Sequence, residues 1–175
     1  MKPPYIIIVA GPNGIGKTTF AKWYLRMFAD CELIVDTDAI ARELVNYPES
    51  ERNVAAGRIA LTMINELIEQ RRSFAIETTM SGKTLAGVLH RAHELEYYIA
   101  IRLLWVPSVR ITIERVEMRR QNGGHSIGLD DQLRRFDRCY INFFTIYRRV
   151  CHDWELYLGI DESNESFARG EGGLI

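Results

Sequence analysis

A glycine-rich run ending in a lysine and two threonines stands near the start of the chain, and its residue types are those that bind phosphate. Gly11 and Gly16 are separated by four residues, and Lys17 and Thr18 follow directly, as in a P-loop. Glycines let successive backbone N–H groups point into one concavity, and the helix beginning near Gly16 directs its positive end there. The lysine reaches the β and γ phosphates, and the threonine hydroxyl ligates Mg²⁺. The sequence therefore predicts an ATP and Mg²⁺ site formed by Gly11, Pro12, Asn13, Gly14, Ile15, Gly16, Lys17, Thr18 and Thr19.

Two further apolar segments are followed by residues with carboxylate or hydroxyl side chains. Asp36 ends the segment 32–36 and Asp38 follows it, while Glu77 closes the segment 73–77, with Thr79 just beyond it. A phosphotransferase needs a carboxylate that orients the acceptor hydroxyl and takes its proton, which is the role we predict for Asp38. Asp36 then faces the Mg²⁺ region, while Glu77 and Thr79 bind the acceptor. The alternatives are that both aspartates cap the next helix and that Glu77 is a solvated strand end.

Two groups of arginines flank a second glycine-containing loop, residues 121–128. We interpret the region of about 115–138 as a lid that closes over the triphosphate and neutralises charge on the transferred phosphoryl group. His125 in the loop either contacts phosphate or makes a local hydrogen bond. Each arginine alone is as well explained as a solvated surface residue, and Arg115 is the one we favour for catalysis. The arginines concerned are Arg115, Arg119, Arg120, Arg134, Arg135 and Arg138.

Apolar segments that alternate with amphipathic ones must position these residues. Strands are expected over 5–10, 32–36, 73–77, 97–106 and 154–158, with helices between them and a long helix over 129–151. This order is typical of an α/β fold, and the P-loop makes it a nucleoside-monophosphate-kinase-like P-loop NTPase. We expect a five-stranded parallel sheet with helices on both faces, in a single domain spanning residues 1–175. The pattern assigns no element to the polar tail, residues 161–175. The carboxyl ends of the strands bring the candidate residues to one crevice.

The composition restricts the partners that we expect. The chain has 22 Lys and Arg against 23 Asp and Glu, so no bulk attraction to nucleic acid or membrane is expected. No apolar run approaches the ~18 residues of a membrane span. Three cysteines without a CxxC pair favour reduced thiols and a cytoplasmic location.

In the order of its motifs, the chain resembles the zeta-toxin kinases and their short chromosomal relatives. The segments are GPNGIGKTTFA, VDTDAIA, SFAIETTMSGKT, LLWVPS, ERVEMR, NGGH and LRRF, spread over residues 5 to about 157. The resemblance implies ATP-dependent phosphorylation of a hydroxyl of UDP-N-acetylglucosamine, and an antitoxin protein as a partner. The family's P-loop lysine falls on Lys17, its catalytic aspartate on Asp38, and its substrate-binding glutamate and threonine on Glu77 and Thr79. One phosphate-contacting arginine falls on Arg115, and for the second the nearest choices are Arg119 and Arg120.

The chain departs from the family pattern at three places. Ser126-Ile127-Gly128 replaces a segment that usually contains proline, which predicts a looser hinge. Ser81 stands where the larger toxins have an arginine, so the sugar or uridine contacts differ. Tyr157-Leu158-Gly159 replaces the usual approach to the nucleotide-base pocket.

Other functions are compatible with the same residues. One is a kinase for another small hydroxyl compound, such as a free sugar, a nucleoside or an antibiotic, which would retain Lys17 and Asp38. Another is a binding module that switches a partner by its ATP state and has no small acceptor. A polynucleotide end kinase is disfavoured by the near-zero net charge.

Overall fold

A six-stranded sheet forms the centre of the molecule, in the order β2-β3-β1-β4-β5-β6. The computed structural model describes residues 3–29, 31–121, 128–159 and 164–174. The first five strands are parallel, and β6 pairs antiparallel with β5. The strands are β1 (Tyr5–Ala10), β2 (Ile34–Asp36), β3 (Phe74–Thr78), β4 (Tyr98–Trp105), β5 (Asp153–Leu158) and β6 (Ser166–Glu171).

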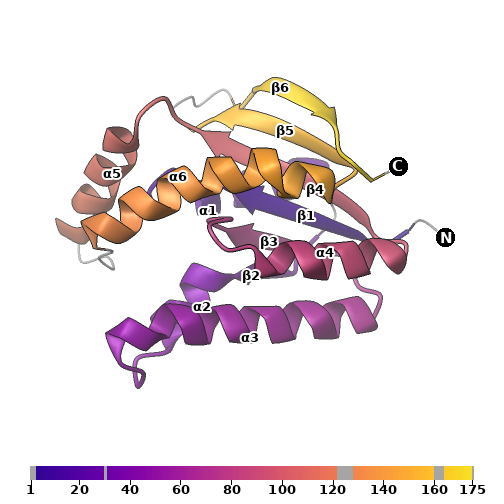
Figure 1. The fold of residues 1–175 in the computed structure, drawn as a ribbon, viewed down its shortest axis with the longest axis horizontal. Coiled ribbons are helices and arrows are strands. Elements are labelled where there is room, and N and C mark those ends of the chain that lie inside the picture. The colour runs from indigo at the N-terminus through magenta and orange to yellow at the C-terminus, as the bar shows by residue number, and fades with distance from the viewer. Residues whose placement is uncertain (1–2, 30, 122–127, 160–163, 175) are drawn as a thin grey trace.

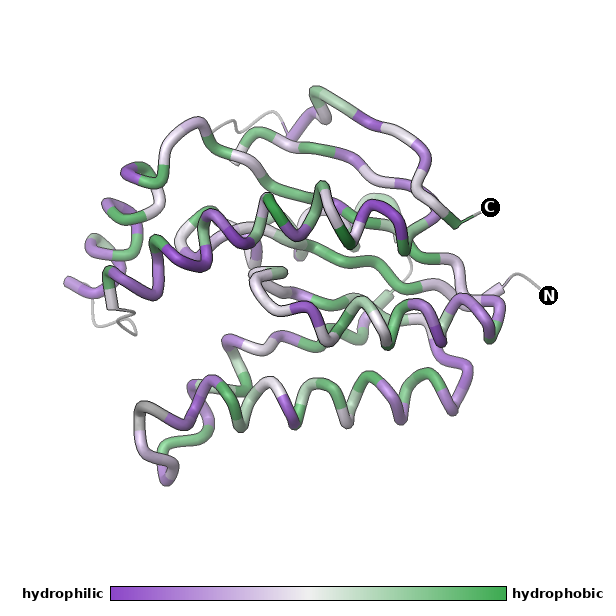
Figure 2. The backbone as a smooth tube through the Cα atoms, viewed as in Figure 1, coloured by the Kyte–Doolittle hydropathy of each residue, from purple (hydrophilic) through white to green (hydrophobic). Residues whose placement is uncertain are grey.

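Helices cover both faces of this sheet (Figure 1). The core beneath α3, α4 and α6 contains Ile6 and Ile8 of β1, and the core beneath α1 contains Ile7 and Val9 of the same strand. Successive strand side chains point to opposite faces, so a continuous β-branched run fills both cores. The central strands β1 and β4 are accordingly mostly green, that is hydrophobic, in Figure 2. The helices are α1 (Lys17–Phe28), α2 (Thr37–Glu43), α3 (Glu49–Glu69), α4 (Thr84–Glu94), α5 (Val109–Gln121), α6 (Leu129–Thr145) and the 3₁₀ turn η1 (Tyr147–Arg149).

The expected α/β P-loop kinase fold is confirmed, but the sheet is mixed and has six strands, where five parallel strands were expected. The additional strand β6 comes from the tail to which the sequence pattern assigned no element. It pairs with β5 along its length, and the indole N–H of Trp154 adds a hydrogen bond to the carbonyl of Glu171 at 3.0 Å. A side chain at Gly170 would approach the same indole to 2.6 Å. This contact joins residues distant in sequence, so a local pattern does not reveal it.

The helix expected over 129–151 is shorter than predicted. It ends at Thr145, and η1 leads into β5. The chain must turn here because β5 begins at Asp153, and the turn is held by the Tyr147 hydroxyl, which donates to the carbonyl of Gly82 at 2.8 Å. The apolar periodicity continues through the turn, since Tyr147 and Cys151 are both buried.

Because β1 to β5 are parallel, their carboxyl ends lie at one edge of the sheet, and the candidate residues follow those ends. β1 runs toward α5 and the start of α6, whereas both chain termini lie at the opposite end of the molecule (Figure 1). Glu77 near the end of β3 lies opposite Val9 of β1 on one side and Asp36 of β2 on the other. Within the described residues, no helix is long and apolar enough to cross a membrane.

Candidate active site

The P-loop connects β1 to α1 and has the backbone conformation that its glycines permit. Gly14 and Gly16 have φ values of 80° and 102°, in the left-handed region that other residues avoid. Gly16 is the N-cap of α1, and no side chain caps this helix end. The first turn of α1 therefore presents its positive end to the loop, which suits a phosphate group.

Lys17 lies folded over the loop, with only 5% of its surface exposed. Its ammonium donates to the carbonyl of Pro12 at 3.2 Å. No carboxylate lies within 4.0 Å of it in the described part of the chain. A buried ammonium held mainly by a carbonyl is a strong site for an added anion, as the P-loop pattern predicts.

Helix α5 supports the P-loop from behind. A side chain at Gly14 would meet the carbonyl oxygen of Thr112 at 2.6 Å and Val116 at 2.8 Å. Arg115 donates through Nη1 to the carbonyl of Ile15 at 3.2 Å and to that of Gly159 at 2.7 Å. The structure therefore places Arg115 between the P-loop and the end of β5, where it contacts backbone.

Thr18 and Glu77 form a hydrogen bond between the P-loop and β3. The Thr18 hydroxyl donates to Glu77 Oε1 at 2.8 Å, and Glu77 is only 5% exposed. Burial raises the pKa of the Glu77 carboxyl, and the nearby charge of Asp36 raises it further, whereas Lys17 and the Thr18 hydrogen bond act in the opposite direction.

These two side chains fit a magnesium ion that is shared with phosphates. No group of three His, Cys, Asp or Glu residues that could hold a metal by itself occurs among the described residues. Mg²⁺ at nucleotide sites typically takes one or two protein oxygens, with phosphates and waters completing its octahedron. A buried carboxylate next to the P-loop hydroxyl supplies such oxygens, and a cation would relieve its unfavourable burial.

The two aspartates after β2 take different positions. Asp36 is the N-cap of α2, and its Oδ1 accepts from the backbone N–H groups of Asp38 and Ala39 at 2.9 and 3.1 Å. Asp38 lies in the first turn of α2, and its Oδ2 accepts from Nδ2 of Asn13 in the P-loop at 3.4 Å. The helix-cap interpretation thus applies to Asp36, whereas the carboxylate of Asp38 faces the phosphate loop.

A pocket of about 540 Å³ lies beside these groups, between α3, the end of β3 and α6. Asp38, Glu77 and Thr79 all line it, so the structure brings the predicted acceptor-side residues to one cavity. Thr79 and Ser81 share a hydrogen bond of 3.0 Å at its edge. A volume of this order is typical of small-ligand sites.

The predicted lid residues are only partly brought together. Arg119 is exposed, and Arg120 forms a two-pronged ion pair with Glu117 on the outer face of α5. His125 and the loop 122–127 lie outside the described residues. Three arginines of α6 line the acceptor pocket, and sequence reasoning missed a fourth, Arg58 of α3. Only the packing of α3 against the sheet reveals it, because no local motif surrounds it.

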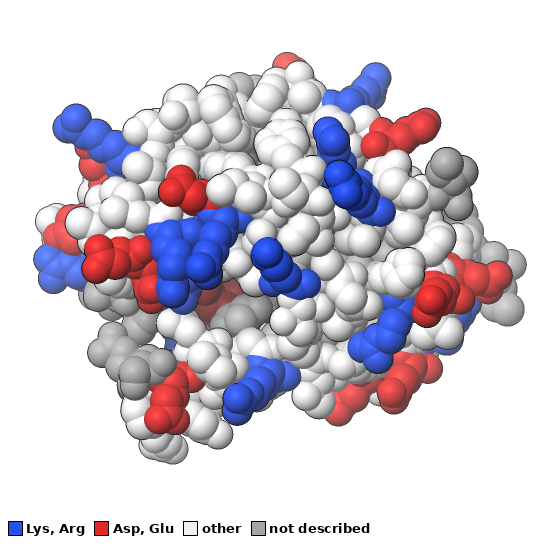
Figure 3. Space-filling model, in the orientation of Figure 1, with Lys and Arg blue, Asp and Glu red and all other residues white. Residues whose placement is uncertain are grey.

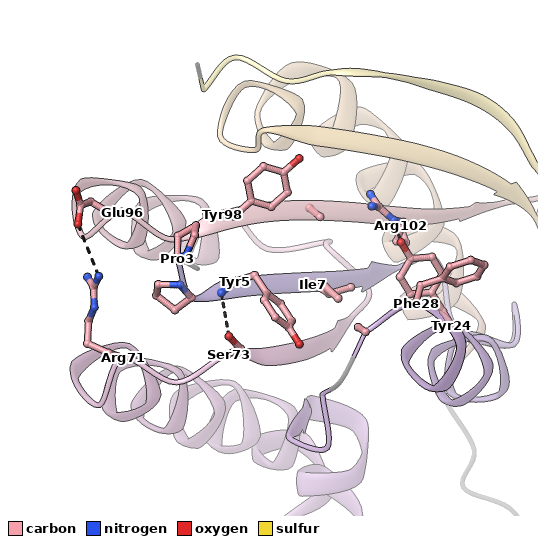
Figure 4. A pocket seen from close by; sticks show the side chains of 13 residues that line it. Pro3, Tyr5, Ile7, Tyr24, Phe28, Arg71, Ser73, Glu96, Tyr98 and Arg102 are labelled. Atoms are coloured by element: carbon pink, nitrogen blue, oxygen red, sulfur yellow. Dashed lines mark hydrogen bonds and ion pairs between the residues drawn. The ribbon is translucent and has the colours of Figure 1, made fainter. Parts of the chain in front are cut away.

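A larger cavity, of about 1300 Å³, lies beside the amino-terminal parts of β1 and β4, away from the P-loop (Figure 4). Aromatic side chains such as Tyr24 and Phe28 surround it, together with Arg102 and, at the other end, the Arg71–Glu96 ion pair. The buried Arg102 is already bonded to the Tyr24 hydroxyl and to carboxylates of β5. None of the P-loop or acceptor-side residues lines this cavity, so the smaller pocket is the candidate active site.

Fold and site together define a P-loop kinase-like α/β protein, which implies nucleotide binding. A model of the AAA domain family matches residues 6–139, and the chain belongs to this family. An uncharacterized protein of Haemophilus influenzae is 30% identical over 128 residues, which span 71% of this chain and 86% of that protein.

Two solved structures share the fold over nearly the whole chain. The structure reported for the PezAT chromosomal toxin–antitoxin system of Streptococcus pneumoniae superposes with a TM-score of 0.70, at 15% identity, over 97% of this chain and 72% of that one. The structure of AvrRxo1-ORF1:-ORF2 with ATP gives a TM-score of 0.71, at 15% identity, over 98% of this chain and 59% of that one. At these identities the likeness concerns the fold alone.

Proposed function

We propose that this protein is an ATP- and Mg²⁺-dependent phosphotransferase of the zeta-toxin type, which phosphorylates a hydroxyl of UDP-N-acetylglucosamine. The observation that carries the proposal is the position of Asp38. Its carboxylate faces Asn13 of the P-loop at 3.4 Å and also lines the acceptor pocket, so one group borders both substrates. A general base must occupy this position between donor phosphate and acceptor hydroxyl.

The remaining roles follow from the positions of the side chains. Lys17 and the P-loop amides hold the β and γ phosphates. Thr18 and Glu77 would hold Mg²⁺, which neutralises charge on the phosphates when bound. Asp38 orients the acceptor hydroxyl and accepts its proton, while Thr79 positions the acceptor. Glu77 accepts a hydrogen bond from Thr18 and also lines the pocket. It therefore lies where it would contact the metal and also the acceptor, and acceptor binding is the role that the family resemblance implies for it.

Identifying the product tests this proposal. Purified protein is incubated with Mg-ATP and a panel of UDP-sugars, free sugars, nucleosides and aminoglycosides, and mass spectrometry detects the gain of one phosphate. We expect phosphorylated UDP-N-acetylglucosamine. Phosphate on another acceptor would overturn the substrate and retain the chemistry. ADP release without any phosphorylated acceptor would favour the nucleotide-switched binding module.

We propose further that the protein acts as a toxin that a partner protein silences by covering the P-loop. The fold shared with the PezAT structure supports this proposal. Induced expression should arrest bacterial growth, and the Asp38→Asn variant expressed at the same level should not. Equal growth arrest by both proteins would show that the effect does not depend on phosphotransfer.

A further inference from the structure

The acceptor pocket has arginines on two facing walls. Arg58 projects from α3, and α6 contributes Arg134, Arg135 and Arg138. Figure 3 shows basic side chains gathered over α6 beside a hollow that contains acidic atoms at its depth, with further basic side chains on the α3 side. The acidic residues of the pocket lining are Asp38 and Glu77, the groups assigned above to the hydroxyl and the metal.

Among the residues that the structure describes, only one of these four arginines has a carboxylate partner. Arg134 pairs with Asp131 at 2.6 Å. For Arg58, Arg135 and Arg138, no carboxylate lies within 4.0 Å in the ranges that the structure describes. Arg135 is half-buried, and partly desolvating an unpaired guanidinium has an energetic cost. Arg58 and Arg138 are exposed, and with Arg135 they place three guanidinium groups around one cavity. Together these groups provide a positive field that an anionic ligand would satisfy.

Part of the remaining pocket lining is apolar. Ile64 of α3, Ile76 of β3 and Met80 are buried residues that line the same cavity. Such walls exclude water and strengthen electrostatic interactions nearby. A cationic acceptor such as an aminoglycoside would be repelled by the arginines, and a neutral sugar would not use them.

We propose that Arg58 from α3 and Arg138 from α6 bind the phosphate groups of the acceptor while the acceptor hydroxyl faces Asp38. The inference rests on the proposed kinase function and assigns the residues that select the acceptor. Planar guanidinium groups suit phosphate oxygens because they donate two parallel hydrogen bonds. Arg58 is a specificity-determining residue in this arrangement. Helix α3 packs on α2, β2 and α4 and does not form the P-loop, so Arg58 acts on the acceptor and not on ATP.

Steady-state kinetics of Arg58→Gln test the assignment. The charged acceptor is UDP-N-acetylglucosamine and the neutral one is N-acetylglucosamine. We expect the KM for the charged acceptor to rise about 10-fold or more, because a charge-assisted hydrogen bond to phosphate is lost. The kcat and the KM for ATP should change less than about twofold, and activity toward the neutral acceptor should be unaffected. Arg138→Gln should raise the same KM.

The matched control is Arg72→Gln. Arg72 is exposed, like Arg58, and it does not line the pocket. Because both side chains are on the surface, neither substitution is expected to prevent folding. An unchanged KM for UDP-N-acetylglucosamine in both Arg58→Gln and Arg138→Gln would overturn the inference, as would an equal change in Arg72→Gln.

A binding measurement separates this inference from the proposed function. With the nucleotide site filled by Mg²⁺ and a non-hydrolysable ATP analogue, titration calorimetry measures the affinity of UDP for the wild type, Arg58→Gln and Arg72→Gln. If the wild type phosphorylates neither acceptor, the proposed UDP-N-acetylglucosamine kinase activity fails, and calorimetry still decides the arginine site. Weaker UDP binding in Arg58→Gln alone supports the site, and equal binding in all three proteins refutes it.

Discussion

Arg115 offers a sharp test, because sequence and structure suggest different roles for it. The family resemblance makes it an arginine that stabilises the transferred phosphoryl group. In the structure it bonds instead to the carbonyls of Ile15 and Gly159 at 3.2 and 2.7 Å. The substitution Arg115→Met separates the two roles, since methionine retains much of the apolar stem and removes the guanidinium.

The expected cost follows from these two contacts. A hydrogen bond from a charged donor contributes about 1.5–3 kcal/mol when buried. The hydrogen bond from Arg115 to the Ile15 carbonyl is at the long end of the usual distances. The Arg115 side chain is only half-buried, so in the variant water would satisfy part of the hydrogen-bonding capacity of the two carbonyls. We therefore expect a loss of about 2 kcal/mol in unfolding free energy, which lowers the Tm by roughly 4–8 °C in a chain of this size. If the loop loosens by the same amount, ATP affinity falls by up to about 30-fold.

Thermal unfolding, ATP titration and kcat are measured together for Arg115→Met. Arg119→Met is the stability control, because Arg119 lies on the same helix and is exposed. An unchanged Tm with kcat reduced by about 10³-fold or more would refute the structural role. That result would show that Arg115 acts on the transition state, as arginines at phosphoryl-transfer sites do.

Three further substitutions test other parts of the account. Gly14→Ala should cost about 2–4 kcal/mol of unfolding free energy and abolish ATP binding, because φ is 80° and the new methyl group would meet the Thr112 carbonyl oxygen at 2.6 Å; retained binding in a titration would contradict this. The raised pKa of Glu77 means that its ionised form disfavours folding, so the wild type should lose stability relative to Glu77→Gln as the pH rises from the ordinary glutamate value of 4.5 through the raised pKa. Urea unfolding at pH 4.5 and pH 7 checks the sign, and a difference that moves the other way would refute it. Arg102→Leu should destabilise by about 3–5 kcal/mol, because Arg102 is only 9% exposed and Asp153 would lose its buried partner; an unchanged urea midpoint would disprove this.

The sequence predicts the architecture around the P-loop because the physics there is local. A continuous apolar run such as Tyr5–Ala10 forms a strand buried on both faces, and the glycine pattern requires one particular turn after it. The alternation of such runs with amphipathic helices then requires parallel pairing and brings the strand ends to one edge. The strand β6 escapes this reasoning, since it is polar and is defined by its pairing with β5 and by contacts with Trp154.

The same distinction applies to the site. Motif spacing predicts that Lys17, Thr18 and Asp38 lie near one another, because each follows the end of a strand, and the structure places them at the same edge of the sheet. It does not distinguish the helix-capping Asp36 from Asp38, which differ in the direction of their carboxylates. It also does not reveal Arg58, whose place in the pocket depends on how a whole helix packs against its neighbours.

The proposed function depends above all on Asp38 as the general base, and the substitution Asp38→Asn tests this role. The amide retains the shape of the side chain and cannot accept the proton of the acceptor hydroxyl. Phosphotransfer to UDP-N-acetylglucosamine and the Kd of Mg-ATP are measured on the same preparations. The account predicts that kcat falls by about 10²–10⁴-fold while the Kd for ATP changes by less than about threefold. Loss of ATP binding together with turnover would contradict it and would assign Asp38 to the metal or to the structure of the loop.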